Sequence, residues 1–218
     1  LLIASPANPT GSMLAREDLA MLVAAARDAR RWLISDEIYH GLTYAMPEVT
    51  ALSLWDQAIV INSFSKYFSM TGWRIGWMVV PEPLIRAIER LAQNLYIAPP
   101  TISQAAALAA FDAGEELEAY KAVYAKSRAM LLDELPRAGF RKLAPADGAF
   151  YLYADVAHLT DDSEVFVRRM LKEIGIAATP GVDFDEEQGR RFVRFSYAGT
   201  FENMREAVRR LRAWTPAG

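Results

Sequence analysis

Short apolar runs alternate along the first part of the chain with stretches in which apolar residues recur every three or four positions. Four such runs predict buried strands, at residues 1–4, 32–35, 58–62 and 75–80. The stretch at residues 16–30 predicts an amphipathic helix between the first two strands. Continuous apolar strands separated by helices are typical of an α/β fold in which a largely parallel sheet is covered on both faces.

The second part of the chain is rich in helices and has shorter strands. The pattern predicts helices at residues 82–95, 101–113, 115–135, 163–174 and 201–214. It predicts strands at residues 149–154, 176–178 and 192–196. We therefore expect a smaller α+β unit from about residue 118 onward, after a larger unit that covers residues 1–117.

Composition narrows the class of protein. The hydrophobic share of 52% excludes a disordered chain. The net charge of -3 gives no basic surface for nucleic acid, and no run approaches the roughly 20 apolar residues that span a bilayer. The chain has no Cys and only two His, so we expect no disulfide, no metal site and a cytoplasmic setting. It opens inside an apolar run without Met, which suggests a piece of a longer protein.

The segment between the third and fourth strands carries the most informative chemistry. Lys66 follows the hydroxyls of Ser63 and Ser65, and Arg74 stands eight positions later. Hydroxyls and a guanidinium are what a phosphate monoester needs, and a lysine amine beside them could form a Schiff base with an aldehyde cofactor. The alternative is a solvated lysine at a strand end.

Asp36 lies at the C-terminal end of the second strand, where open α/β sheets place ligand groups. A buried carboxylate needs a cation, and a protonated pyridine nitrogen would supply one. The same residue could equally cap the helix that follows.

Arg194 alternates with apolar residues on a predicted strand. An inward-facing arginine needs an anion, and a substrate carboxylate would suit its two-pronged donor geometry. A surface arginine on the solvent face of the strand is the alternative. Asn8 belongs to a turn, Asn8-Pro9-Thr10-Gly11, which alone is a weak signal.

These motifs occur in a fixed order: N-P-T-G, S-D-E-x-Y, S-F-S-K, M-T-G-W-R, G-A-F-Y and R-F-S. In this order they resemble the C-terminal portion of class I/II (fold type I) pyridoxal-phosphate-dependent aminotransferases, closest to the aspartate and aromatic branch. The resemblance implies pyridoxal 5'-phosphate as cofactor and Lys66 as the catalytic residue that binds it covalently. It assigns the other cofactor contacts to Asn8, Asp36, Tyr39, Ser63, Ser65 and Arg74.

The resemblance further implies that Arg194 and Asn8 bind the substrate. Residues 1–117 would form part of the large cofactor-binding domain and residues 118–218 the small C-terminal domain. The implied reaction moves an amino group between an L-amino acid, aspartate or aromatic, and a 2-oxo acid, in a homodimer without nucleic acid or membrane partners. It leaves two alternatives open: a carbon–sulfur β-lyase, and an aminotransferase-like effector domain of a transcription regulator.

Overall fold

The computed structural model describes residues 1–214, and the chain divides into two compact units, each with its own sheet. Unit 1 comprises Leu1–Pro6 and Met13–Ala119, and unit 2 comprises Ala7–Ser12 and the chain from Tyr120 onward. The division falls within helix α4 (Gly114–Arg137), close to the boundary expected near residue 118. Among the described residues, no helix is long and apolar enough to cross a membrane.

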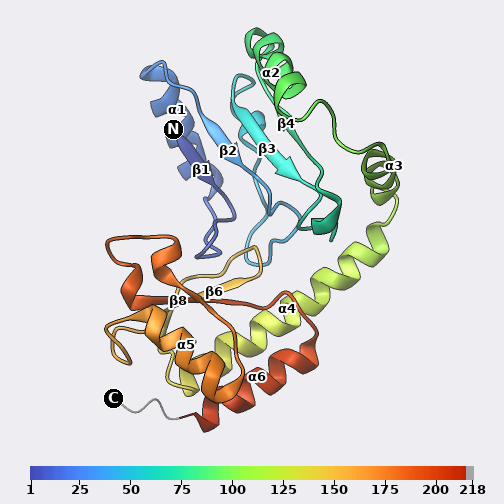
Figure 1. Cartoon of the computed structure of the whole chain (residues 1–218). Coiled ribbons are helices and arrows are strands. Elements are labelled where there is room, and N and C mark those ends of the chain that lie inside the picture. Colours follow the sequence, from blue (N-terminus) through green and yellow to red (C-terminus); the bar gives the residue numbers. More distant parts are fainter. Residues whose placement is uncertain (215–218) are drawn as a thin grey trace. The chain divides into compact units, whose positions relative to one another are not determined.

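Unit 1 is built on a four-stranded sheet of order β1-β2-β3-β4 (Figure 1). The strands are β1 (Leu2–Ala4), β2 (Ile34–Asp36), β3 (Ile59–Ser63) and β4 (Gly76–Val79). The first three are parallel, and β4 runs antiparallel to β3. The largely parallel sheet predicted from the apolar runs is therefore confirmed, with one reversed strand at its edge.

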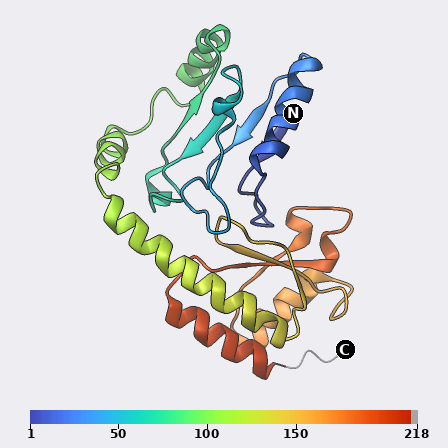
Figure 2. The same cartoon turned by 180° about the vertical axis from the view of Figure 1, so that it is seen from behind.

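Helix α1 (Arg16–Asp28) supplies the core on one face of this sheet, and it lies beside β1 in both views (Figures 1 and 2). Its buried residues Leu19, Val23 and Ala26 follow the three-to-four spacing that predicted the helix. They pack in one cluster with Leu33 and Val60 from the strand region. The short helix η1 (Ala51–Ser53) closes the same cluster through Ala51.

Strand β4 differs from the expectation that both faces are covered. Trp77 is 36% exposed, Met78 49% and Val79 40%. Helix α2 (Glu82–Leu95) has a clear apolar face but no buried residue. Helix α3 (Thr101–Ala110) buries only Ser103 and Ala107. Strand β4 and helices α2 and α3 therefore have apolar side chains that remain largely exposed among residues 1–214.

Unit 2 has an antiparallel sheet of order β5-β6-β8-β7. Its strands are β5 (Lys142–Leu143), β6 (Tyr151–Asp155), β7 (Thr179–Pro180) and β8 (Phe192–Ser196). The prediction of a strand at 176–178 is wrong, because the pairing with β8 begins one residue later, at Thr179. β5 was not predicted, since two residues carry no periodicity.

The helices of unit 2 start and stop where local signals place them. α5 (Ser163–Ile174) begins after Asp162, whose Oδ1 accepts from the amides of Glu164 at 2.9 Å and Val165 at 3.2 Å. It ends at Gly175, which takes the left-handed conformation at φ 66°. Thr200 caps α6 (Phe201–Ala213) in the same way, through the amide of Asn203. Both helices begin at their predicted residues because the capping residues are adjacent in the chain, and α6 ends one residue before the predicted end at 214.

Residues 7–12 form a tight turn that packs within unit 2. The amide of Gly11 donates to the carbonyl of Ala7 at 2.7 Å, and the amide of Gly148 donates to the carbonyl of Gly11 at 2.9 Å. Gly11 has φ +67°, and a Cβ there would lie 2.9 Å from both the Ala146 Cα and the Gly148 carbonyl oxygen. Only glycine fits this position, because both the left-handed backbone and the close approach exclude a side chain.

We predict that Gly11→Ala lowers the free energy of unfolding by about 1–3 kcal/mol, because the substitution meets both strain and backbone contacts. Urea denaturation measures the change. Gly114→Ala is the matched control, since a Cβ there meets nothing within 4 Å. Equal stability of the Gly11→Ala and Gly114→Ala variants would show that the 7–12 turn is not closely packed.

Tyr67 joins two segments of unit 1. Its ring lies against Gly41, where a Cβ would come within 2.5 Å of the ring carbons, and its hydroxyl donates to Glu118 Oε1 at 2.6 Å. Burial, and then this hydrogen bond, raise the pKa of the Tyr67 phenol to about 12.

A phenol whose pKa is raised on folding stabilises the fold at pH values below its unfolded pKa of about 10, and loses that contribution as the pH rises toward 12. We therefore predict that the phenolate absorbance of the native chain minus that of Tyr67→Phe shows one group titrating near pH 12. A difference titration centred near pH 10 would contradict the raised pKa and the hydrogen bond of Tyr67 to Glu118.

Candidate active site

The loop between β3 and β4 is closed by short-range hydrogen bonds. Ser63 pairs with Gly76 at the end of the β3–β4 ladder. Within the loop, the amide of Met70 donates to the carbonyl of Phe64 at 3.0 Å, and Thr71 Oγ1 donates to the carbonyl of Ser65 at 2.6 Å. The loop that carries Lys66 is therefore a compact turn stabilised by hydrogen bonds between its own residues.

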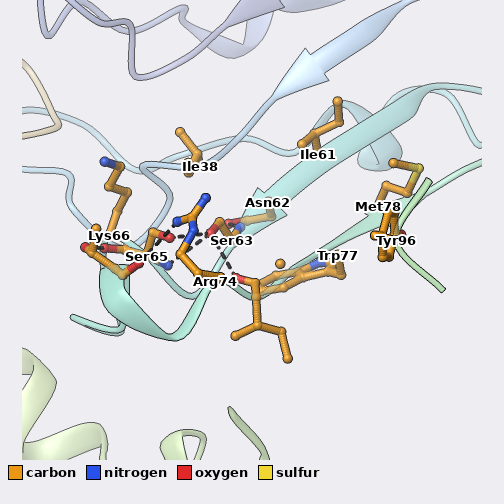
Figure 3. A pocket seen from close by; sticks show the side chains of 13 residues that line it. Ile38, Ile61, Asn62, Ser63, Ser65, Lys66, Arg74, Trp77, Met78 and Tyr96 are labelled. Atoms are coloured by element: carbon orange, nitrogen blue, oxygen red, sulfur yellow. Dashed lines mark hydrogen bonds between the residues drawn. The ribbon is translucent and has the colours of Figure 1, made fainter. Parts of the chain in front are cut away.

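Hydroxyl and guanidinium groups gather at one end of a pocket beside this loop (Figure 3). Ser63 Oγ lies 3.0 Å from Ser65 Oγ and accepts the Ser65 amide at the same distance. Arg74 reaches the pocket from a left-handed backbone position, φ 53°, and its Nη1 donates to the carbonyl of Thr71 at 3.2 Å. This donor set suits the oxygens of a phosphate monoester.

The pocket has a volume of about 520 Å³. Lys66 lines it together with Ser63, Ser65 and Arg74, whereas Trp77, Met78 and Tyr96 lie at its other end (Figure 3). A polar end with a lysine amine and an apolar end with aromatic side chains are the features of a site for a flat, phosphate-bearing molecule. The arrangement favours the cofactor interpretation of Lys66 over a solvated lysine.

Tyr39 lies next to Lys66. Its ring is 5% exposed, and Lys66 Nζ lies 5.7 Å from the ring centroid. Ile38, the residue before it, lines the pocket. The turn after β2 therefore brings two of its side chains to the lysine and its pocket.

Asp36 ends β2, as predicted, but it is only half-buried. Its Oδ1 accepts from the amide of Ile38 at 3.1 Å, a bond within the turn after β2 and not the helix cap of the alternative interpretation, since the next helix starts only at Ala51. Asp36 does not line the pocket, in contrast to Ile38. The structure therefore leaves one carboxylate oxygen engaged in the turn, and the pairing of Asp36 with a pyridine nitrogen stays a prediction.

A second group of candidate residues lies in unit 2. Arg194 projects from β8 on the face opposite the buried Val193 and Phe195. Its Nη1 donates to Asn8 Oδ1 at 2.7 Å, and its Nη2 donates to Thr179 Oγ1 at 3.1 Å. Asn8 and Arg194, both assigned to the substrate from the sequence, are therefore direct neighbours.

Two aromatic rings flank the guanidinium of Arg194. Its central carbon lies 4.3 Å from the ring centroid of Tyr151 and 4.7 Å from that of Phe184. Arg194 Nε is buried and has no hydrogen-bond partner among the described residues. A guanidinium held between rings with an unsatisfied donor is suited to bind a carboxylate.

From the sequence, no role was predicted for Tyr151, Thr179 and Phe184, and their contacts with Arg194 were missed. The signal was present in part, because Tyr151 stands in G-A-F-Y and the other two stand in T-P-G-x-x-F. Their meeting at one arginine depends on strand pairing, in which Thr179 lies opposite Arg194. Neither histidine joins a site: His158 Nε2 lies 2.7 Å from the carbonyl of Gly139, and His40 Nδ1 lies 3.5 Å from Glu37.

Each unit thus collects part of the predicted set. Ser63, Ser65, Lys66 and Arg74 line one pocket in unit 1, and Asn8 and Arg194 meet in unit 2. Residues 1–214 contain no group of three or more His, Asp or Glu side chains that could hold a metal ion.

Known proteins match this chain over nearly its whole length. The family of class I and II aminotransferases matches residues 1–211. A valine–pyruvate aminotransferase of Mycobacterium tuberculosis is 47% identical over 224 residues, covering 100% of this chain and 57% of that protein. The chain therefore spans somewhat more than half the length of such a relative.

Solved structures agree. An aminotransferase from Mycobacterium tuberculosis superposes with a TM-score of 0.95 at 47% identity, covering 99% of this chain and 57% of that one. The aspartate aminotransferase of Thermus thermophilus with maleate gives a TM-score of 0.90 at 32% identity, covering 98% and 56%. Sequence motifs, fold and relatives coincide: the chain belongs to the class I and II aminotransferase family.

Proposed function

We propose that the protein containing this chain is a pyridoxal-phosphate-dependent aminotransferase and that Lys66 is its catalytic lysine. The observation that carries the proposal is the pocket of unit 1, where the Lys66 amine shares one end with the hydroxyls of Ser63 and Ser65 and the guanidinium of Arg74. Family membership supports it. Because the chain spans 57% of the relative's length, the activity is proposed for the complete protein.

The residues of unit 1 fit the cofactor's phosphate. The Ser63 hydroxyl donates to Ser65 Oγ at 3.0 Å, both hydroxyls can rotate to donate to phosphate oxygens, and Arg74 adds a permanent positive charge. Ile38 offers an apolar surface to the ring at the same pocket. Asp36 is proposed to pair with the pyridine nitrogen, and Tyr39 and Asn8 with the phenolic oxygen, as the family motifs imply.

Pyridoxal phosphate, when bound, supplies an aldehyde that links to amines and a ring that accepts electrons from the substrate's α-carbon. The chain's own residues then have to move one proton. Lys66 Nζ would hold the cofactor before substrate binds and, as a free amine, would be the base that carries the proton of the substrate's α-carbon. The centroid of the Tyr39 ring lies 5.7 Å from Lys66 Nζ.

Unit 2 contributes the anion-binding group for the substrate. Arg194 binds the α-carboxylate through its two-pronged donor face, and Asn8 and Thr179 hold the guanidinium in position. The unsatisfied Nε of Arg194 supports this role, because a buried donor without a partner is costly unless a ligand satisfies it.

The amino donor expected from the motifs is aspartate or an aromatic amino acid, with a 2-oxo acid as acceptor. The relative named valine–pyruvate aminotransferase adds valine and pyruvate to the substrates that need testing. The homodimer and the cytoplasmic setting implied by the family resemblance belong to the proposal as well.

We predict that Lys66→Ala in the complete gene product abolishes the cofactor absorbance near the visible edge and lowers kcat by roughly 10²–10⁴-fold or more, because the proton carrier is removed. Spectra and transamination with aspartate, phenylalanine and valine measure both effects. Lys172→Ala, an exposed lysine of α5, is the control and should match the unmodified enzyme. Turnover retained in Lys66→Ala would overturn the assignment. Release of pyruvate from cystathionine, with no transamination, would favour the β-lyase alternative.

Arg194→Lys should raise KM for the amino acid and lower kcat/KM by about tenfold to hundredfold, because lysine keeps the charge but cannot form the two-pronged bond. Steady-state kinetics measures the loss. Arg190→Lys is the matched control, because Arg190 forms an exposed ion pair with Asp162. An unchanged KM in Arg194→Lys would place the carboxylate site elsewhere.

A further inference from the structure

Glu37 is a buried carboxylate that the proposed reaction does not use. It is 3% exposed, follows Asp36 directly and stands two residues before Tyr39. A carboxylate is rarely buried unless hydrogen bonds and a cation compensate the loss of water. The hydrogen-bond partners of Glu37 therefore indicate its role in the structure.

One oxygen of Glu37 joins two separate segments of unit 1. Oε1 accepts from Ser35 Oγ at 3.1 Å and from the amide of Ala51 at 2.8 Å. The first donor belongs to β2, and the second begins helix η1, fourteen residues after Glu37. The backbone of Glu37 is held as well, because its amide donates to the carbonyl of Ile61 on β3 at 2.8 Å.

The other oxygen and the carbonyl of Glu37 hold the turn that carries Tyr39. Oε2 lies 3.5 Å from His40 Nδ1, and the amide of His40 donates to the Glu37 carbonyl at 2.9 Å. The turn continues onto Glu48, which accepts from the amide of Gly41 at 3.3 Å and from Thr43 Oγ1 at 2.6 Å. Residues 37–51 thus form a loop held by two carboxylates, the buried Glu37 and the exposed Glu48.

Tyr39 lies within this closed loop and faces Lys66. Its ring is 5% exposed, and its carbonyl accepts the amide of Leu42 at 3.0 Å. Glu37 itself does not line the pocket, whereas its near neighbour Ile38 does. Glu37 can therefore influence the pocket only through the residues that it holds.

We propose that Glu37 is a positioning residue that sets Asp36, Ile38 and Tyr39 for the cofactor through the hydrogen bonds of Oε1 to Ser35 and Ala51. The inference rests on the proposed function. It assigns the effect to hydrogen-bond geometry, so a neutral acceptor of the same size preserves it and an apolar side chain of similar size does not.

Glu37→Gln keeps an acceptor oxygen for Ser35 and Ala51, and Glu37→Met removes both bonds while filling much of the space. We test them in the complete gene product, with Glu17→Gln on the exposed face of α1 as control. Cofactor-free protein is titrated with pyridoxal phosphate to obtain Kd. Hydrogen exchange of the Ala51 amide is followed without cofactor, and melting temperatures confirm that every variant is folded at the assay temperature.

We expect Glu37→Gln to bind pyridoxal phosphate within about threefold of the unmodified protein and Glu37→Met to bind it at least roughly tenfold more weakly. Protection of the Ala51 amide should persist in Glu37→Gln and fall in Glu37→Met. If Glu37→Met does not fold, Ser35→Ala removes one of the two bonds and should weaken binding by about threefold.

A Glu37→Met variant with unchanged Kd would overturn the inference and leave the proposed function intact. Equal weakening by Glu37→Gln and Glu37→Met would overturn it too, because the effect would then depend on charge. Failure of the unmodified protein to bind pyridoxal phosphate would sink the proposed function and this inference with it. Loss of Ala51 protection in Glu37→Met would then still verify the hydrogen bond alone.

Discussion

The closed turn between β3 and β4 is the constraint on which the pocket of unit 1 depends. The two strands are antiparallel, so the chain has to reverse between Ser63 and Gly76. A Cβ at Gly76 would lie 2.7 Å from the carbonyl oxygen of Asn62, so the strands can approach this closely only because residue 76 is glycine. Beneath the turn, Phe64 and Met70 are buried against Ala107. Between these two buried apolar residues, Ser65 and Lys66 line the pocket.

Unit 2 positions Arg194 by a different rule. Side chains alternate across a strand, so burial of Val193 and Phe195 puts Arg194 on the other face of β8. The antiparallel partners then bring Thr179 beside it, and the 7–12 turn brings Asn8. That turn can pack here only because Gly11 has no side chain. The substrate group thus depends on one strand register and one glycine, both remote in sequence from the arginine.

Polar groups behind the pocket of unit 1 are satisfied by specific partners. Glu37 Oε1 accepts hydrogen bonds from Ser35 Oγ and from the amide of Ala51, and the Tyr67 hydroxyl donates to Glu118 Oε1. Glu37 is buried, so leaving its carboxylate unpaired would be costly, and its pairing favours one arrangement of the turn after β2. The family relationship agrees with this geometry, because motifs that match the family lie on those turns. The turns after β2 and β3 therefore carry most of the residues that we propose to bind the cofactor.

The sequence by itself determined the features that depend on nearby residues. Helices α2 and α5 occupy their predicted residues because apolar spacing, proline and caps are local. The motif around Lys66 was readable for the same reason, since its hydroxyls and arginine lie within eight positions. Tertiary structure alone decided the reversed direction of β4, the two-residue strand β5 and the half-burial of Asp36. It also decided that Tyr151 and Phe184 flank Arg194, because contacts between distant segments follow from strand pairing and packing, which no local pattern encodes.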